Sequence, residues 1–364
     1  MKIIKTELFV FDICYREPFH ISVQTTSKKQ GLLVKITTKN GLIGYGEAAP
    51  TKYVTNETIQ TCKKAFLQYL FPAIKGLEAD DIATAHKVMD KAIKGAHSAK
   101  TAIDMALYDI ASKAAGLPLY KYLGGKKDKI QTDMTISIKS PEYMATSAKK
   151  FVKAGFGILK IKLGTTPEKD LKRIKLIRSA IGPLVKIRVD ANQGWKDYKI
   201  AAKLINDLEK YDIELVEQPL PKNDFTGFKK LKKLVNIPIA ADEIAQTLSD
   251  VKRLISDRSV DIVNIKLMKC AGIYHGMEIA EYCKKHNVAC MIGGMCETKV
   301  AVAASAHLAC ANDNFKYADL DGDLLLDDKL VTKASIGLKN GWRTLANYPG
   351  LGIIKINEKI LKSL

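Results

Sequence analysis

The sequence predicts an α/β protein in which an eight-stranded parallel barrel of the TIM type follows a smaller α+β domain. Short β-branched runs recur every 24 to 28 residues, amphipathic helical segments fill most of the intervals, and the N-terminal third lacks this period. The runs are centred on Thr135, Ile161, Ile187, Leu215, Ile239, Val263, Ala289 and Tyr317. A doubly wound open sheet is the alternative, but the glycine-rich dinucleotide loop that usually follows its first strand is absent.

The N-terminal part predicts an antiparallel meander and then helices. Asn40-Gly41 supplies a tight turn between Leu32–Thr38 and Leu42–Tyr45, and the apolar spacing becomes helical from Glu57 to Ala115. The C-terminal tail lacks the barrel period and is expected to pack back on the first domain. The expected α+β domain, barrel and C-terminal segment are residues 1–125, 126–328 and 329–364.

Composition bounds the kind of protein and its partners. The chain has 364 residues, 47% of them hydrophobic and 27% charged, which excludes disordered, collagen-like and coiled-coil classes. Its net charge of +19 is spread along helical stretches in pairs such as Lys149-Lys150, so a nucleic-acid partner is not expected. Seven cysteines without a CxxC pair indicate free thiols, and no apolar run reaches the roughly 18 residues of a membrane span. We expect a cytoplasmic protein with no membrane partner.

Acidic residues end three consecutive strands of the predicted barrel. The third, fourth and fifth runs end at Asp190, Glu217 and Asp242. Because the carboxyl ends of the strands share one rim, these carboxylates should lie close together, and their repulsion requires a cation. All-oxygen ligation without His or Cys favours a hard ion, and Mg²⁺ is the first choice.

Lysines flank this predicted metal site. Lys162 ends the second run and Lys266 the sixth, so they should lie on opposite sides of the barrel, and Lys160 shares a strand face with Lys162. A neighbouring ammonium and the metal charge would lower the pKa of one amine toward that of a useful base. With one lysine on each side of a metal-bound carboxylate, the α-proton can leave from one face and return to the other. The predicted product is the epimer.

Several ordered motifs resemble the enolase superfamily, and within it the muconate lactonizing enzyme subgroup. The resemblance implies an α+β capping domain, a (β/α)7β barrel, Mg²⁺ held by Asp190, Glu217 and Asp242, and Lys162 with Lys266 as the acid/base pair. The motifs are GYGEAAP at Gly44–Pro50, KIK at Lys160–Lys162, DANQGW at Asp190–Trp195, VEQPL at Val216–Leu220, ADE at Ala241–Glu243, NIKLMKCAGI at Asn264–Ile273 and GLGI at Gly350–Ile353.

The eighth strand end narrows the reaction within that subgroup. Asp319 and Asp321 place two carboxylates on one face of the rim, where they would suit a substrate ammonium group. This pair resembles the site that binds the substrate amino terminus in dipeptide epimerases, so the expected substrate is a small dipeptide such as Ala-Glu or another L-Ala-Xaa. An N-acylamino acid racemase or an o-succinylbenzoate synthase is the alternative. Asp323 continues the alternation, which leaves open which aspartates bind.

Three further residues are expected to contact the substrate: Gln24, Thr135 and Cys296. Gln24 stands in a segment near residues 15 to 30 that resembles the mobile loop of the family, at a position where epimerases of Ala-Glu can carry an arginine. The identity of the second amino acid therefore stays open. Cys296, near the seventh strand end, is expected to shape the pocket and not to act as a nucleophile, because no histidine partner is evident. A homo-oligomer is possible.

Overall fold

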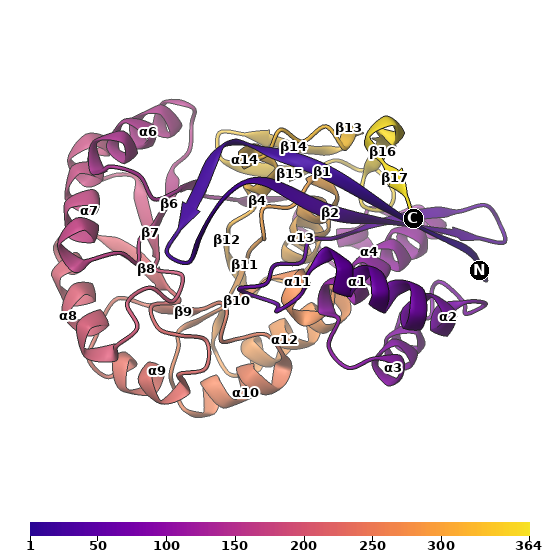
Figure 1. Ribbon diagram of the computed structural model, residues 1–364, viewed down its shortest axis with the longest axis horizontal. Coiled ribbons are helices and arrows are strands. Elements are labelled where there is room, and N and C mark those ends of the chain that lie inside the picture. The colour runs from indigo at the N-terminus through magenta and orange to yellow at the C-terminus, as the bar shows by residue number, and fades with distance from the viewer.

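The centre of the protein is a parallel sheet of eight strands that curls into a barrel. The computed structural model describes residues 1–364, and the strands follow one another around the barrel in chain order from β5 to β12 (Figure 1). They are β5 (Met134–Ile136), β6 (Ile158–Lys162), β7 (Lys186–Asp190), β8 (Ile213–Glu217), β9 (Ile239–Ala241), β10 (Ile262–Ile265), β11 (Ala289–Ile292) and β12 (Phe315–Ala318). Every predicted strand centre lies in one of them, so the predicted parallel barrel is confirmed and the open doubly wound sheet is wrong.

Seven helices connect the strands, which gives the (β/α)7β pattern. Most begin at a Ser, Thr or Asp whose side chain accepts a hydrogen bond from a backbone N–H of the first turn, as Ser140 does from Tyr143 and Thr247 does from Asp250. The α-helix after β12 is the short α14 (Gly322–Leu325). The seven are α6 (Pro141–Lys153), α7 (Pro167–Ile181), α8 (Tyr198–Leu208), α9 (Phe225–Lys232), α10 (Leu248–Ser256), α12 (Ile273–Lys285) and α13 (Lys299–Ala311).

The barrel closes between β5 and β12 mainly through side chains. One backbone hydrogen bond joins these edges, from Asp133 N to Ala318 O at 3.2 Å. The Arg188 guanidinium on β7 reaches the same place and donates to Asp133 Oδ2 at 2.9 Å and to Ala318 O at 2.8 Å. The Thr132 hydroxyl accepts from Leu320 N at 2.7 Å. This seam therefore depends on buried polar groups.

The interior of the barrel is divided between apolar and charged side chains. A small apolar cluster fills the space beside β8 to β11, and its buried members are Leu215, Ala240, Ile262 and Met291. Beside β6 and β7 the inward positions instead carry Lys160 and Arg188, both almost fully buried. Each of these cations therefore needs an acidic partner within the barrel.

The N-terminal domain is a four-stranded antiparallel sheet packed against helices. β1 (Ile3–Ile21), β2 (Gln24–Thr38) and β3 (Ile43–Ala48) form the meander, with helices α1 (Ile59–Ala65), α2 (Phe71–Ile74), α3 (Ile82–Ala92) and α4 (His97–Ala114) after it. A π-helical turn, Phe66–Leu70, joins α1 to α2. The predicted hairpin turn is present, but only Gly41 has a left-handed φ, of 83°.

Residues 15 to 30 form an extended hairpin instead of the expected loop. Antiparallel pairing of β1 with β2 continues to the Ile21–Gln24 pair, with a register shift between Cys14 and Phe19. The hairpin crosses in front of the barrel (Figure 1). At its tip, the Ser22 hydroxyl donates to Asn192 O at 2.7 Å in the loop after β7.

Two carboxylates of the N-terminal domain bind the ends of barrel helices. Glu47 on β3 accepts from Thr298 N at 3.1 Å at the start of α13, and Asp104 on α4 accepts from Tyr274 N at 3.3 Å at the start of α12. Both carboxylates complement the partial positive charge of a helix N-terminus. One cluster of 94 buried apolar residues runs through both parts of the molecule, so the domain is rigidly seated on the barrel.

The C-terminal segment contacts both the barrel and the N-terminal sheet. β14 (Ile336–Lys339) and β15 (Trp342–Leu345) form a sheet with β4 (Lys129–Gln131), and β17 (Lys362–Ser363) pairs with β1. β13 (Val331–Ala334) and β16 (Ile353–Ile356) form a separate pair. Domain boundaries at residues 125 and 328 stay predictions.

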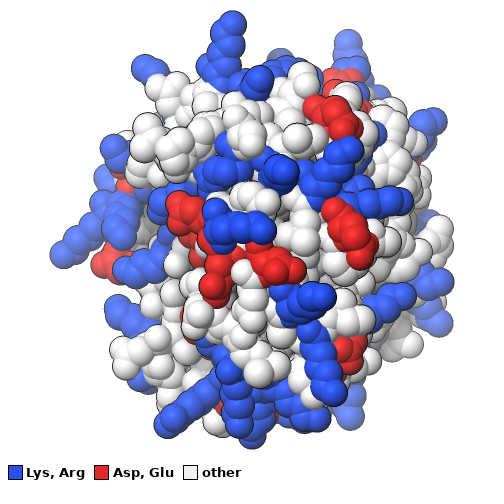
Figure 2. All heavy atoms as spheres, turned by 90° about the vertical axis from the view of Figure 1, so that its left-hand side faces the viewer, with Lys and Arg blue, Asp and Glu red and all other residues white.

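The distribution of surface charge and the character of the helices agree with what the composition predicts. On the face over α6 to α8, Lys and Arg side chains are scattered, with acidic residues among them (Figure 2). No helix is long and apolar enough to cross a membrane.

The C-terminal segment also supplies Arg343, which forms a buried ion pair with Asp323 and donates from Nε to Leu320 O at 2.8 Å. Arg343→Met should lower the free energy of unfolding by about 3 to 5 kcal/mol, because it leaves the Asp323 carboxylate buried without a cation. Urea denaturation measures this loss. The double variant Arg343→Met/Asp323→Asn should lose clearly less, and equal losses would contradict the pairing.

Candidate active site

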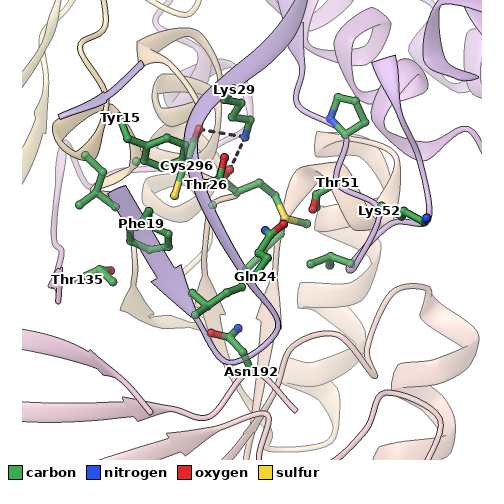
Figure 3. A pocket seen from close by; sticks show the side chains of 18 of the residues that line it. Tyr15, Phe19, Gln24, Thr26, Lys29, Thr51, Lys52, Thr135, Asn192 and Cys296 are labelled. Atoms are coloured by element: carbon green, nitrogen blue, oxygen red, sulfur yellow. Dashed lines mark hydrogen bonds between the residues drawn. The ribbon is translucent and has the colours of Figure 1, made fainter. Parts of the chain in front are cut away.

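A cavity of about 380 Å³ lies at the carboxyl end of the barrel, beneath the β1–β2 hairpin. It collects side chains from both parts of the molecule (Figure 3). The sequence-predicted residues that line it are Gln24, Thr135, Lys162, Lys266, Cys296, Asp319 and Asp321. The structure therefore brings seven of the predicted site residues to one cavity.

Lys162 and Lys266 approach this cavity from opposite sides of the barrel. Lys162 ends β6 and Lys266 follows β10, and three strands separate β6 from β10 along the sheet. Lys162 Nζ lies 2.6 Å from Asp190 Oδ2, and Lys266 Nζ lies 2.8 Å from Asp242 Oδ2. Two amines thus face one space, each with its own carboxylate.

Lys160 has a different position from the one expected of a catalytic residue. It is completely buried and does not line the cavity. Its Nζ lies 2.7 Å from Glu217 Oε2, 2.7 Å from Asp319 Oδ2 and 3.2 Å from Asp190 Oδ2. Burial disfavours the ammonium form, but these carboxylates outweigh burial and raise the pKa of Lys160 well above its ordinary value. Lys160 is therefore a central positive charge of the network.

The three predicted metal carboxylates stand side by side and are fully buried. Asp190 pairs with Glu217 in the register of β7 and β8, and Asp242 directly follows β9. Burial, Asp190 and Asp242 together raise the pKa of Glu217 to about 6. Burial alone would also raise the pKa of Asp242. The ammonium groups of Lys266 and Lys269 outweigh burial and hold that pKa below its usual range.

These residues fit a hard divalent cation. All ligand atoms of the set are oxygens, and Glu217 Oε2, which is sealed from solvent, has Lys160 Nζ 2.7 Å away as its charge partner. Glu243, next to Asp242, has an unpartnered buried Oε2, and burial together with Asp242 and Asp190 raises its pKa to about 8. Such crowding of acids is relieved by a cation of two charges, and oxygen donors suit Mg²⁺.

A second acidic group lies at the seam. Asp133, Asp319 and Asp321 each bring one carboxylate oxygen to within 4.8 Å of the others. Asp319 is paired with Lys160, Asp133 with Arg188, and Asp321 accepts from Thr135 N at 2.6 Å. Burial and Asp319 raise the pKa of Asp321 to about 7. This arrangement attracts a cation or a protonated amine.

Asp323 does not belong to that group, although its spacing from Asp319 and Asp321 had left this open. Arg343 holds it in a buried ion pair away from the cavity. Asp133 and Arg343 were both missed by the sequence analysis. Asp133 stands just before the first barrel strand, whereas the predicted site residues stand mainly at strand ends.

The remaining predicted contacts lie around the cavity wall. Gln24 is at the hairpin tip and Thr135 is on β5, and Figure 3 shows them on different sides of the space. Cys296 has a left-handed φ of 56°, and burial raises the pKa of its thiol to about 11. A thiol with this pKa is protonated at neutral pH and is a poor nucleophile. Cys296 therefore contributes to the shape of the cavity wall.

Lys29 fastens the hairpin to the barrel. Its ammonium group donates to the carbonyl oxygens of Met295 and Cys296, the latter at 3.0 Å (Figure 3). Glu297, which is buried beside them, gains a compensating charge from Lys29. The hairpin is therefore held at its tip by Ser22 and in its middle by Lys29.

Two family models cover most of the chain. Residues 5–124 match the mandelate racemase / muconate lactonizing enzyme N-terminal domain, and residues 143–359 match the enolase C-terminal domain-like family. The chain therefore belongs to the mandelate racemase / muconate lactonizing enzyme family of the enolase superfamily.

Relatives of known activity are similar over almost the whole chain. A hydrophobic dipeptide epimerase from Enterococcus faecalis is 42% identical, with 97% of this chain and 99% of that protein covered. An L-Ala-D/L-Glu epimerase from Bacillus subtilis is 38% identical, with 97% of each covered. An N-succinyl-L-Arg/Lys racemase from Bacillus cereus is 32% identical, with 100% and 98% covered.

Solved structures agree with these similarities. A substrate-liganded complex of the Bacillus subtilis epimerase gives a TM-score of 0.95 at 37% identity, covering 98% of this chain and 100% of that one. The Enterococcus faecalis dipeptide epimerase, complexed with Mg and L-Leu-L-Tyr, gives 0.94 at 41% identity with the same coverage. The expected membership of the enolase superfamily is confirmed.

Lys29→Met should increase the mobility of the hairpin, because it removes two hydrogen bonds that a charged donor makes to the barrel. Amide hydrogen exchange in residues 16–30 should quicken by at least roughly tenfold, since such bonds contribute about 1.5 to 3 kcal/mol each. Lys28→Met is the matched control, because the Lys28 side chain also lines the cavity but makes no hydrogen bond. Equal exchange in both variants would contradict the role of Lys29.

Proposed function

We propose that this protein is a Mg²⁺-dependent dipeptide epimerase that inverts the α-carbon of the C-terminal residue. The observation that carries this proposal is the placement of Lys162 and Lys266 across one cavity, with Asp319 and Asp321 at its wall. The named activities of the relatives, which are epimerases and racemases, support the same class of isomerase. A screen of L,L-dipeptides in D₂O with Mg²⁺ tests it, because turnover incorporates deuterium at the C-terminal α-carbon.

Asp190, Glu217 and Asp242 would hold the cation. A bound Mg²⁺ would draw electron density from the substrate carboxylate and make the neighbouring α-proton more acidic. Lys162 and Lys266 then act on that proton from the two sides. One removes it as a neutral amine, and the other, as an ammonium group, returns a proton to the opposite face.

Asp319 and Asp321 would bind the substrate ammonium. The two carboxylates are buried, so a charge-assisted hydrogen bond to them is stronger than one in water. Their negative charge, which is little screened by solvent at these buried positions, disfavours an anionic acyl group at the same place. This supports a free dipeptide over the alternative N-acylamino acid or o-succinylbenzoate substrates.

The two side chains of the dipeptide meet different walls. Tyr15 and Phe19 lie on one side of the cavity, and the polar Gln24 and Lys52 lie on another (Figure 3). An L-Ala-Xaa substrate, with Glu or a neutral residue in the second place, remains our proposal. Cytoplasmic location and a possible homo-oligomer stay predictions.

Removing the metal should abolish turnover. Excess chelator should stop deuterium incorporation, and Mg²⁺ should restore it, because the substrate carboxylate then regains its cation. Asp242→Asn should weaken Mg²⁺ binding, which titration calorimetry measures. Full activity in excess chelator would contradict the metal site.

Each of the two lysines should exchange the α-proton of one stereoisomer of the substrate. Lys162→Ala should block exchange of the α-proton in one epimer and Lys266→Ala in the other, each by at least roughly 10² to 10⁴-fold. Proton NMR of each epimer in D₂O measures this exchange. Wild-type exchange of both epimers in either variant would contradict the assignment.

Acetylating the amino terminus of the dipeptide should lower kcat/KM by roughly tenfold or more, because it removes the charge that Asp319 and Asp321 bind. Asp321→Asn should reduce activity on the free dipeptide much more than on the acetylated one. If N-acyl or N-succinyl amino acids react faster than every free dipeptide, the racemase alternative replaces this proposal.

A further inference from the structure

A second cavity, of about 610 Å³, opens at the other end of the barrel. Its walls come from the places where strands begin, including Ile158 of β6, Lys186 of β7 and Phe315 of β12. Catalytic sites of such barrels lie at the carboxyl ends of the strands. The function proposed above therefore makes no use of this cavity.

Arg188 forms part of the inner wall of the second cavity. Only 2% of this residue is exposed to solvent. Its guanidinium carbon Cζ lies 5.3 Å from the centroid of the Tyr317 ring. Nε donates to Glu214 Oε2 at 2.6 Å and Nη1 to Asp133 Oδ2 and Ala318 O. Nη2 donates to no group of the protein, although the guanidinium has five N–H donors. The free Nη2 donor at the cavity wall can therefore bind an acceptor that enters the cavity.

The rim of the second cavity carries more basic than acidic groups. Four lysines stand there, and two already have acidic partners: Lys127 lies 2.7 Å from Asp313 and Lys186 lies 2.7 Å from Glu214. Lys129 and Lys316 have no carboxylate within ion-pair distance. With Arg188, the lining carries five cationic groups against Asp128 and Glu214. When Asp313 and Asp133, the partners of Lys127 and Arg188, are counted as well, the local net charge is +1.

An exposed aromatic ring completes the rim. Trp342 on β15 is 38% exposed, and Lys129 Nζ lies 5.3 Å from its ring centroid. An indole face at the mouth of a basic cavity can stack on a planar ring, while the lysines and the guanidinium bind oxyanions. The volume lies in the range of pockets that hold small organic ligands.

We propose that this cavity binds a phosphorylated planar ring, the chemistry of a nucleoside diphosphate. The phosphate oxygens accept from Arg188 Nη2 and from Lys129 and Lys316, and the ring stacks on Trp342. The site lies on the opposite side of the barrel from the proposed epimerase site, so the two proposals can fail independently.

Calorimetric titration with ADP, in metal-free buffer at physiological salt, tests this site. Omitting Mg²⁺ prevents the diphosphate from binding through a cation at the carboxylates of the first site. We expect one ADP per chain and a Kd in the micromolar range, roughly 10 to 500 μM. Absence of saturable binding at millimolar ADP overturns the proposal.

Variants separate this cavity from the general basic surface. Lys129→Gln/Lys316→Gln should weaken ADP binding by roughly tenfold or more, because two charge-assisted contacts are lost. Lys87→Gln/Lys91→Gln removes the same charge from exposed positions on α3 and should change Kd by less than about twofold. An equal loss in both double variants overturns the assignment to this cavity.

Trp342→Ala tests the stacked ring. It should weaken binding of ADP by roughly fivefold or more, as base stacking on an aromatic side chain contributes about 1 to 3 kcal/mol. Binding of pyrophosphate, which has no ring, should be unchanged. Equal affinity of the wild-type protein for pyrophosphate and ADP overturns the assignment of a ring-bearing ligand.

Discussion

A charge sealed inside a protein persists only with an opposite charge beside it, and this requirement organises one half of the barrel. Lys160 pairs with three carboxylates at the ends of three different strands, and Arg188 pairs with two more. The other half is filled by a small apolar cluster beside β8 to β11. The rim therefore rests on a charged layer, which fixes where each carboxylate and amine can stand.

The N-terminal domain is seated by the same principle. Glu47 and Asp104 find their partners in helix N-termini of the barrel, where backbone N–H groups would otherwise lack acceptors. Gly46 allows the close approach, because a Cβ there would lie 1.9 Å from Ala102 O of α4. With the domain held in this way, Ser22 and Lys29 place the hairpin over the cavity.

Local sequence pattern predicted the eight strands and the strand-end groups, because strand period and polar termination are properties of a few adjacent residues. It could not pair residues that are distant in the chain. Three such contacts depend on the folded arrangement: Arg343 with Asp323, Arg188 with Asp133, and Lys29 with Met295. A loop was expected at residues 15 to 30, because neither the pairing of β1 with β2 nor the barrel contacts of Ser22 and Lys29 appears in a local pattern.

The seam between β5 and β12 contributes both to the closure of the barrel and to the acidic group at its carboxyl end. A barrel closed by one backbone bond and a few side chains has a defined place at which it can open, unlike one closed by a continuous ladder. Asp133, which joins that seam, also belongs to the acidic group with Asp319 and Asp321. A substitution at Asp133 would therefore change both the closure of the barrel and the charge beside Asp319 and Asp321.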